Sequence, residues 1–259
     1  MIFRHTTTFF LLPRLLSGIF FLGSSTGLLM GQSPGPYRLR PAPEAAWSAA
    51  ALGLTLAGRQ IEQRIAPLTA PQLAALDRSR IPAFDRFASY YWSPRAARVS
   101  DYLLLGSIAA PYALSLLRKS TRSDWPQLSL MATQTFFLTY GITNLTKVAA
   151  LRNRPYTYLD AAGNPDLQAA QASHDARLSF FSGHSSVSAA MCFFSARVYA
   201  DYYPSSKAKP WVWAGAAVIP ATTALLRVKA GKHYPSDVIA GYAIGAATGL
   251  LVPLLHRQR

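Results

Sequence analysis

The residues best suited to chemistry are two histidines, His184 and His233, each with polar neighbours. His184 lies in the segment Ser-Phe-Phe-Ser-Gly-His-Ser-Ser, residues 179–186, directly before an apolar run. Ser182 or Ser185 can cap the helix that this run predicts, so that backbone N–H groups and the positive end of the helix dipole would face an anion. We interpret this segment as a candidate phosphate site. The plainer alternative is a helix start with a solvated histidine.

Asp237 follows His233 by four residues, and Pro235 between them suits the first position of a helix. This spacing predicts that the carboxylate lies about one turn from the imidazole, within reach of the ring. An aspartate that keeps one imidazole nitrogen protonated leaves the other free to act as nucleophile or base. A local hydrogen bond at a helix start is the alternative.

Basic residues accompany both histidines. Lys147 and Arg154 are seven residues apart, close to two helical turns, and Pro155 ends the helix that would carry them. Arg227 precedes His233 by six residues. Cations at a helix end can also be dipole partners or interfacial anchors. Four further basic residues match no pattern and are interpreted as solvated loop charges, with recruitment of anionic lipid or substrate as the alternative: Arg152, Arg177, Lys229 and Lys232.

In order and spacing, these segments resemble the three-part signature of the type-2 phosphatidic acid phosphatase and vanadium haloperoxidase superfamily, in its lipid phosphatase branch. The segments are Lys147-x6-Arg154-Pro155, Ser182-Gly183-His184 and Arg227-x5-His233-x3-Asp237. The resemblance covers about residues 100–255. Phe181 stands where the family usually has proline, and Leu226 where it usually has serine.

The resemblance implies a phosphatase that works through a phosphohistidine. His233 would attack phosphorus, Asp237 would orient His233, and His184 would protonate the leaving oxygen and later activate water. The phosphoryl oxygens would be bound by Lys147, Arg154, Ser182, Gly183 and Arg227. Phosphoryl transfer requires mainly positioning and positive charge around these oxygens. No cofactor is implied, and no Asp, Glu or His cluster suited to a metal accompanies the site, so we expect metal-independent catalysis.

Five apolar runs must position these groups, at about residues 102–117, 128–150, 184–201, 211–226 and 236–255. No alternating strand pattern or Asn-Gly hairpin interrupts them, so the predicted fold class is all-α, a helical bundle. The longer runs can cross the hydrocarbon core of ~30 Å, which predicts a membrane-embedded protein. We assign residues 101–259 to this phosphatase core.

Residues 1–31 predict a signal peptide or an uncleaved anchor, because basic residues precede an apolar run and small residues follow it. Residues 32–100 predict a linker and peripheral or interfacial helices. Within this range, the proline-rich residues 32–44 are expected to lack regular structure. The apolar piece 45–56 would cover only about 18 Å and could not cross a membrane unaided. The aromatic cluster at 84–92 suits the headgroup boundary.

The formal net charge of +15 favours anionic partners. Basic residues are scattered between apolar runs, which argues against nucleic acid, and no obligate protein partner is evident. We expect a lipid phosphate substrate and a membrane as partners. The single cysteine, Cys192, excludes an intrachain disulfide.

If five runs span a membrane, the basic short turns share one face, which marks the cytoplasmic side. Their residues are Arg118, Lys119, Arg122, Lys207, Lys209, Arg257 and Arg259. An exported N-terminus predicts the same orientation, with the site facing the periplasm or exterior of a bacterial-type inner membrane. The predicted function is hydrolysis of a lipid phosphate or lipid pyrophosphate. A soluble periplasmic acid phosphatase, a vanadium-dependent haloperoxidase and a non-enzymic binder of anionic lipid are the alternatives.

Overall fold

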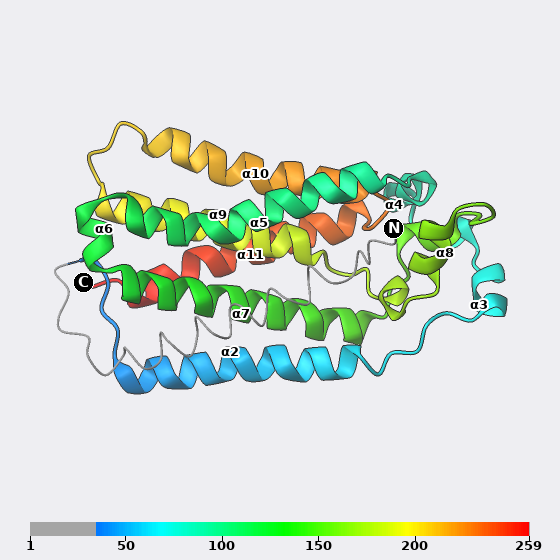
Figure 1. Ribbon diagram of the computed structural model, residues 1–259, viewed down its shortest axis with the longest axis horizontal. Coiled ribbons are helices and arrows are strands. Elements are labelled where there is room, and N and C mark those ends of the chain that lie inside the picture. Colours follow the sequence, from blue (N-terminus) through cyan, green and yellow to red (C-terminus); the bar gives the residue numbers. More distant parts are fainter. Residues whose placement is uncertain (1–34, 259) are drawn as a thin grey trace.

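The computed structural model describes residues 35–258, which form an all-α bundle. Within this part of the chain there is no strand, only an isolated bridge between Tyr37 and Arg257. The long helices run along the long axis of the molecule (Figure 1): α2 (Pro41–Glu62), α5 (Pro94–Leu117), α7 (Trp125–Ala150), α9 (Gly183–Tyr202), α10 (Lys209–Lys229) and α11 (Pro235–His256). The last five coincide with the five apolar runs, and the predicted fold class is confirmed. The predicted signal segment lies outside the described residues.

Short helices cover one end of the bundle (Figure 1), which we call the long-loop end because it carries the connections 63–93, 151–182 and 230–234. These helices are α3 (Ala70–Ala74), η2 (Arg78–Arg80), α4 (Ala83–Arg86), η3 (Phe87–Tyr90), η4 (Pro155–Tyr158), α8 (Pro165–Gln171) and η5 (His174–Arg177). At the opposite, short-turn end, α6 (Lys119–Ser123) joins α5 to α7, and residues 203–208 join α9 to α10. The three motif segments, at residues 147–155, 182–184 and 227–237, therefore all lie at the long-loop end.

The helix α2 is longer than the sequence predicts. It begins at Pro41, inside the stretch expected to lack regular structure, and its 22 residues cover about 33 Å. Proline fits the first turn because an N–H there has no partner within the helix. The linker prediction is therefore wrong for residues 41–44. The length argument against a span at 45–56 also fails, because the helix continues beyond the apolar piece at both ends.

Close backbone approach joins α2 to α7. A Cβ added at Gly58 would lie 3.0 Å from the Cβ of Asn144, and one added at Gly141 would lie 2.9 Å from the Cβ of Leu54. The Thr55 hydroxyl on α2 donates a hydrogen bond of 2.9 Å to the carbonyl oxygen of Phe137 on α7. The division of the chain at residue 101 stays a prediction, while α2 packs within the same bundle as the predicted core.

A stripe of glycines brings α11 against α9. Gly241, Gly245 and Gly249 are spaced by four residues and lie on one face of α11. A Cβ at Gly245 would clash with the carbonyl oxygen of Ser186, and one at Gly249 with that of Ala190. Small residues at a helix interface let two backbones touch. This contact holds the start of α9 beside the start of α11, so the two histidine motifs become neighbours.

The outer surface of the bundle is apolar. Among the described residues, α5, α10 and α11 are long and apolar enough to cross a membrane, and only 28–39% of their apolar windows is buried inside the bundle. Two leucines illustrate the exterior: Leu225 is 71% exposed and Leu255 is 69% exposed. The other two predicted spans, α7 and α9, are mostly buried within the bundle. An apolar exterior of this extent indicates association with a membrane.

We expect Gly245→Ala to destabilise the bundle, because the added methyl group would meet the Ser186 carbonyl oxygen and force α9 and α11 apart. Overpacking of this kind costs about 1–3 kcal/mol. The measurement is the midpoint of thermal unfolding in detergent. Gly215→Ala on α10 is the control, because nothing lies within 4 Å of a Cβ added there. Equal midpoints for the two variants would contradict close packing of α9 on α11.

Candidate active site

The structure brings the predicted site residues together from four long helices and the loops beside them. Arg154 follows α7, Ser182 and His184 lie at the start of α9, and Arg227 lies in the last turn of α10. His233 and Asp237 flank the start of α11. We call Lys147, Arg154 and Arg227 the cationic cluster, since the positive charges of all three act on His233. The predicted grouping of these side chains at one place is therefore found.

His233 is almost completely buried and is bonded through both ring nitrogens. Its Nδ1 lies 2.8 Å from the carbonyl oxygen of Ser179, and its Nε2 lies 3.2 Å from Nη1 of Arg154. Because a carbonyl oxygen only accepts, Nδ1 carries the proton and Nε2 keeps its lone pair. Burial, together with the charges of Arg154 and Arg227, holds the pKa of His233 well below its usual value. The ring is therefore neutral, and the lone pair of its Nε2 faces the guanidinium of Arg154.

Asp237 does not contact His233 as the spacing predicts. Its Oδ2 lies 3.7 Å from Nδ1 of His233, beyond hydrogen-bonding distance. Ser179 connects the two residues instead, because its carbonyl oxygen accepts from His233 and its hydroxyl donates to Oδ2 of Asp237 at 2.6 Å. The backbone N–H of Tyr234 donates to the same oxygen at 2.9 Å. Asp237 therefore acts on the histidine through Ser179, to which the sequence analysis assigned no role.

Arg152 supplies the counter-charge for Asp237. Its Nη1 lies 2.5 Å from Oδ1 of Asp237, and its Nη2 lies 2.8 Å from Oδ2 of Asp85. Asp85 also accepts from the backbone N–H of Ser236 at 2.9 Å. Burial lowers the pKa of Arg152, but the two carboxylates outweigh it and raise the pKa. The interpretation of Arg152 as a solvated loop charge is wrong, since it joins two carboxylates from different segments.

Arg154 is held by a carboxylate that the sequence analysis left unassigned. Its Nη2 lies 2.6 Å from Oδ1 of Asp175, its Nε donates to the Asp175 carbonyl oxygen at 2.8 Å, and its Nη1 donates to the Lys232 carbonyl oxygen at 3.0 Å. Burial raises the pKa of Asp175, but the charges of Arg154 and Lys147 outweigh burial and hold this pKa well below its usual value. Asp175 is therefore ionised and keeps the guanidinium beside His233.

His184 and Arg227 both contact one carboxylate, that of Asp101 on α5. The Nε2 of His184 lies 2.7 Å from Oδ1 of Asp101, and Nη1 of Arg227 lies 3.5 Å from the same oxygen. Arg227 is buried, and its Nε has no hydrogen-bond partner among the described residues. A buried donor of this kind suits a phosphoryl oxygen as ligand. Asp101 directly precedes the apolar run 102–117 and belongs to none of the three motifs, so no motif in the sequence pointed to it.

Ser182, one of the two serines predicted as a possible cap, caps α9. Its Oγ accepts from the backbone N–H of Ser185 at 3.3 Å and from the Ser185 hydroxyl at 3.1 Å. Its own N–H donates to the carbonyl oxygen of Asp237 at 3.1 Å. Ser182 is completely buried, so its hydroxyl serves the helix start in this structure. Contacts from Ser182 and Gly183 to a phosphate stay predictions.

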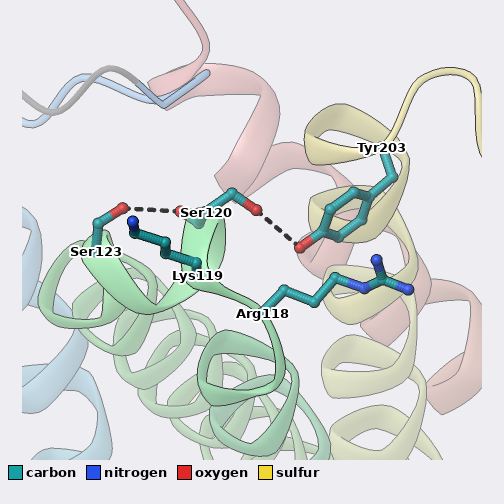
Figure 2. A pocket seen from close by; sticks show the side chains of 5 residues that line it. All are labelled: Arg118, Lys119, Ser120, Ser123 and Tyr203. Carbon is teal, nitrogen blue, oxygen red and sulfur yellow. Dashed lines mark hydrogen bonds between the residues drawn. The ribbon is translucent and has the colours of Figure 1, made fainter.

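The cavity drawn in Figure 2 lies elsewhere, at the short-turn end. It has a volume of about 690 Å³, and its lining residues are Arg118, Lys119, Ser120, Ser123 and Tyr203. Figure 2 shows the Ser120 hydroxyl bonded to the Tyr203 hydroxyl, at 3.0 Å. No histidine lines this cavity. Groups suited to phosphoryl transfer thus gather at the long-loop end and not around this cavity. Among the described residues, no three His, Cys, Asp or Glu side chains form a group that could hold a metal ion.

Comparison with known proteins gives a family match and two curated relatives. A sequence model of the PAP2 superfamily matches residues 128–259. The relatives are the decaprenylphosphoryl-5-phosphoribose phosphatases of Mycobacterium tuberculosis strains CDC 1551 / Oshkosh and ATCC 25618 / H37Rv. Each is 28% identical over 197 residues, which cover 76% of this chain and 93% of the relative. No solved structure matches the chain.

The family match and the site agree. Residues 128–259 include every predicted catalytic and phosphate-binding residue, whereas Asp85 and Asp101 lie before the match. The resemblance that the three motifs carry is therefore confirmed. The chain belongs to the PAP2 superfamily, and it is a phosphoric ester hydrolase.

Proposed function

We propose that the protein hydrolyses a lipid phosphate through a phosphohistidine and without a metal ion. The observation that carries this proposal is the position of the neutral, buried His233, whose Nε2 lies 3.2 Å from Arg154 in the cationic cluster. A nucleophile beside phosphate-binding cations is what phosphoryl transfer requires. The apolar exterior and the lipid in the names of the relatives support a lipid substrate.

In the first step, the lone pair of His233 Nε2 forms a P–N bond while the bond from phosphorus to the leaving oxygen breaks. Before this bond forms, Arg154 transfers its hydrogen bond from Nε2 to a phosphoryl oxygen, which frees the lone pair, and the cationic cluster stabilises the charge on the three oxygens. His184, held by Asp101, gives a proton to the leaving oxygen. In the second step, His184 takes a proton from water, the water oxygen bonds to phosphorus, and the P–N bond breaks to release phosphate.

Two alternative activities use the same groups. A soluble acid phosphatase has no need of the apolar surface on α5, α10 and α11. A vanadium-dependent haloperoxidase would hold vanadate at His233, and oxidation of bromide by the vanadate-loaded protein would favour that activity. Lipid phosphate hydrolysis accounts for both the apolar exterior and the nucleophile, so it is the function that we propose.

We expect His233→Ala to lower turnover of a lipid phosphate by at least about a thousandfold, because the variant lacks the nucleophile. The wild type should yield a phosphohistidine after quenching in alkali, where the P–N bond survives. Asp237→Asn should retain part of the activity, since it changes only the orientation of the ring. All assays contain EDTA. Strict dependence on added Mg²⁺, or turnover by His233→Ala at the wild-type rate, would contradict the mechanism.

We expect Asp101→Asn to slow the cleavage of alkyl phosphates by at least about tenfold, because Asp101 orients the acid His184 and an alkoxide leaves only when protonated. Nitrophenolate needs no proton to leave. The first-turnover burst from p-nitrophenyl phosphate should therefore keep its wild-type rate, and Asp101→Glu should restore part of the activity toward alkyl phosphates. Equal losses with both substrates would indicate a purely structural role for Asp101.

We propose that the short-turn end faces the cytoplasm and that the site opens to the outside. The turns at residues 118–124 and 203–208 are short and basic. At the long-loop end, aromatic side chains are exposed in a way that suits the headgroup region: Phe84, Phe87, Tyr90, Tyr91 and Tyr102.

The helix α2 affects this assignment. Tyr37 pairs with Arg257 at the short-turn end, so residue 37 and the end of α11 lie on the same side. If α2 crosses the membrane and the site faces outward, residue 37 lies in the cytoplasm. A cleaved signal peptide would instead leave residue 37 outside the cell membrane, because the chain that follows such a peptide is exported. The two indications therefore conflict, because an exported N-terminus places residue 37 outside, whereas the basic turns place the short-turn end, where Tyr37 pairs with Arg257, in the cytoplasm. We propose that the basic turns determine the orientation.

Single cysteines in a Cys192→Ser background test the orientation. Ala162→Cys lies at the long-loop end and Ser205→Cys at the short-turn end, and both positions are exposed. With intact cells, a membrane-impermeant thiol reagent should label only Ala162→Cys, and permeabilised cells should show labelling of both. Labelling of Ser205→Cys alone would invert the orientation. Equal labelling of both variants in intact cells would favour a soluble periplasmic protein.

A further inference from the structure

Lys232 lies next to the nucleophile, and the sequence analysis interpreted it as a solvated loop charge. Its backbone is fixed between two members of the cationic cluster: its N–H donates to the Arg227 carbonyl oxygen at 3.1 Å, and its carbonyl oxygen accepts from Arg154 at 3.0 Å. Its Nζ lies 4.8 Å from the centre of the Trp92 ring and 4.6 Å from that of Tyr156. The ammonium is therefore held by two aromatic rings.

Three distant segments build the surface under this ammonium. Gly231 has a φ of 68°, and a Cβ there would clash with the carbonyl oxygen of Tyr91. Only glycine allows this backbone approach, which packs residues 91 and 92 against residue 231. The N–H of Tyr156 donates to the Gly231 carbonyl oxygen at 3.1 Å, and the rings of Trp92 and Tyr156 meet edge to face with centres 5.6 Å apart. The position of Lys232 is thus set by rigid neighbours.

The charge of Lys232 is not neutralised within the described part of the chain. The two carboxylates near it, Asp175 and Asp101, pair with Arg154 and Arg227, and Lys232 itself forms no ion pair there. Burial, with repulsion from the two arginines, lowers the pKa of Lys232 to about 8. A cation placed beside other cations is stabilised when an anion joins them. Lys232 therefore has the chemistry of a binding group for an anion.

The position of Lys232 indicates which part of a substrate it meets. Arg154, Arg227 and His233 are each at most 6% exposed, whereas Lys232 and Trp92 are only partly buried. Trp92 directly follows the exposed aromatic residues Tyr90 and Tyr91 in the chain. The phosphoryl group that is transferred must reach His233 and the two buried arginines. The leaving group, which carries the lipid, must then extend outward past Lys232.

We propose that Lys232 binds a second phosphate group, carried by the leaving group of the substrate. This inference rests on the proposed function and narrows its substrate class to lipids with two phosphate groups. Two kinds of lipid share this chemistry: a lipid diphosphate, and a phosphorylated sugar joined to a lipid through a phosphodiester. In both, the terminal phosphoryl group is transferred to His233, and the other phosphate departs with the lipid.

Farnesyl diphosphate and farnesyl monophosphate test the proposal, because they differ only in the second phosphate. In Lys232→Gln, kcat/KM for the diphosphate should fall at least about tenfold, mainly through KM, while that for the monophosphate changes less than about twofold. Lys232→Arg keeps the charge and should retain the preference for the diphosphate. Lys229→Gln is the matched control, because Lys229 lies three residues earlier and is exposed. A prenylphosphoryl ribose 5-phosphate in a parallel assay distinguishes the two lipid classes.

The outcomes separate this inference from the proposed function. Equal losses on both farnesyl substrates in Lys232→Gln, with an unchanged midpoint of thermal unfolding, would overturn the role in binding a second phosphate. No loss on any substrate would overturn it as well. If the wild-type protein hydrolyses p-nitrophenyl phosphate but no lipid phosphate, the proposed function itself fails.

Discussion

The direct backbone contact between α9 and α11 is the constraint on which the site depends. Gly241, Gly245 and Gly249 leave no room for a side chain between the two helices. Because the starts of both helices lie at the same end, this contact places the cap of α9 beside Asp237, whose carbonyl oxygen accepts from the N–H of Ser182. Ser179 then reaches both His233 and Asp237. The geometry around His233 is thus a consequence of helix packing.

A second constraint is the charge of the buried site. Cations in a poorly solvated region are costly unless carboxylates compensate them. Asp175 pairs with Arg154, Asp101 with Arg227, and Asp85 shares Arg152 with Asp237. Both Asp85 and Asp101 precede the segment that matches the family. The N-terminal half of the chain therefore completes the electrostatics of a site whose signature lies in the other half.

The environment of Lys232 differs from that of the two arginines in the cationic cluster, which pair with carboxylates. Its ammonium contacts rings rather than a carboxylate, and it is less buried than Arg154 and Arg227. Aromatic rings stabilise a cation without removing its charge, so the charge stays available to a ligand. This difference is the basis of the proposal that Lys232 binds a second phosphate on the leaving group.

The sequence by itself determined the all-α class, the five apolar helices and the order of the motif residues, because periodicity, capping and spacing are local properties. It also predicted a cap at Ser182 or Ser185, and in the structure Ser182 is the cap. Tertiary structure alone decided which atoms meet: the carbonyl oxygen of Ser179 replaced Asp237 as the partner of His233, and Asp101 reached His184 across 83 positions of the chain. It also decided that α2 begins at Pro41 and packs on α7. Such contacts depend on how helices that are distant in sequence pack against each other. A local sequence pattern does not contain this information.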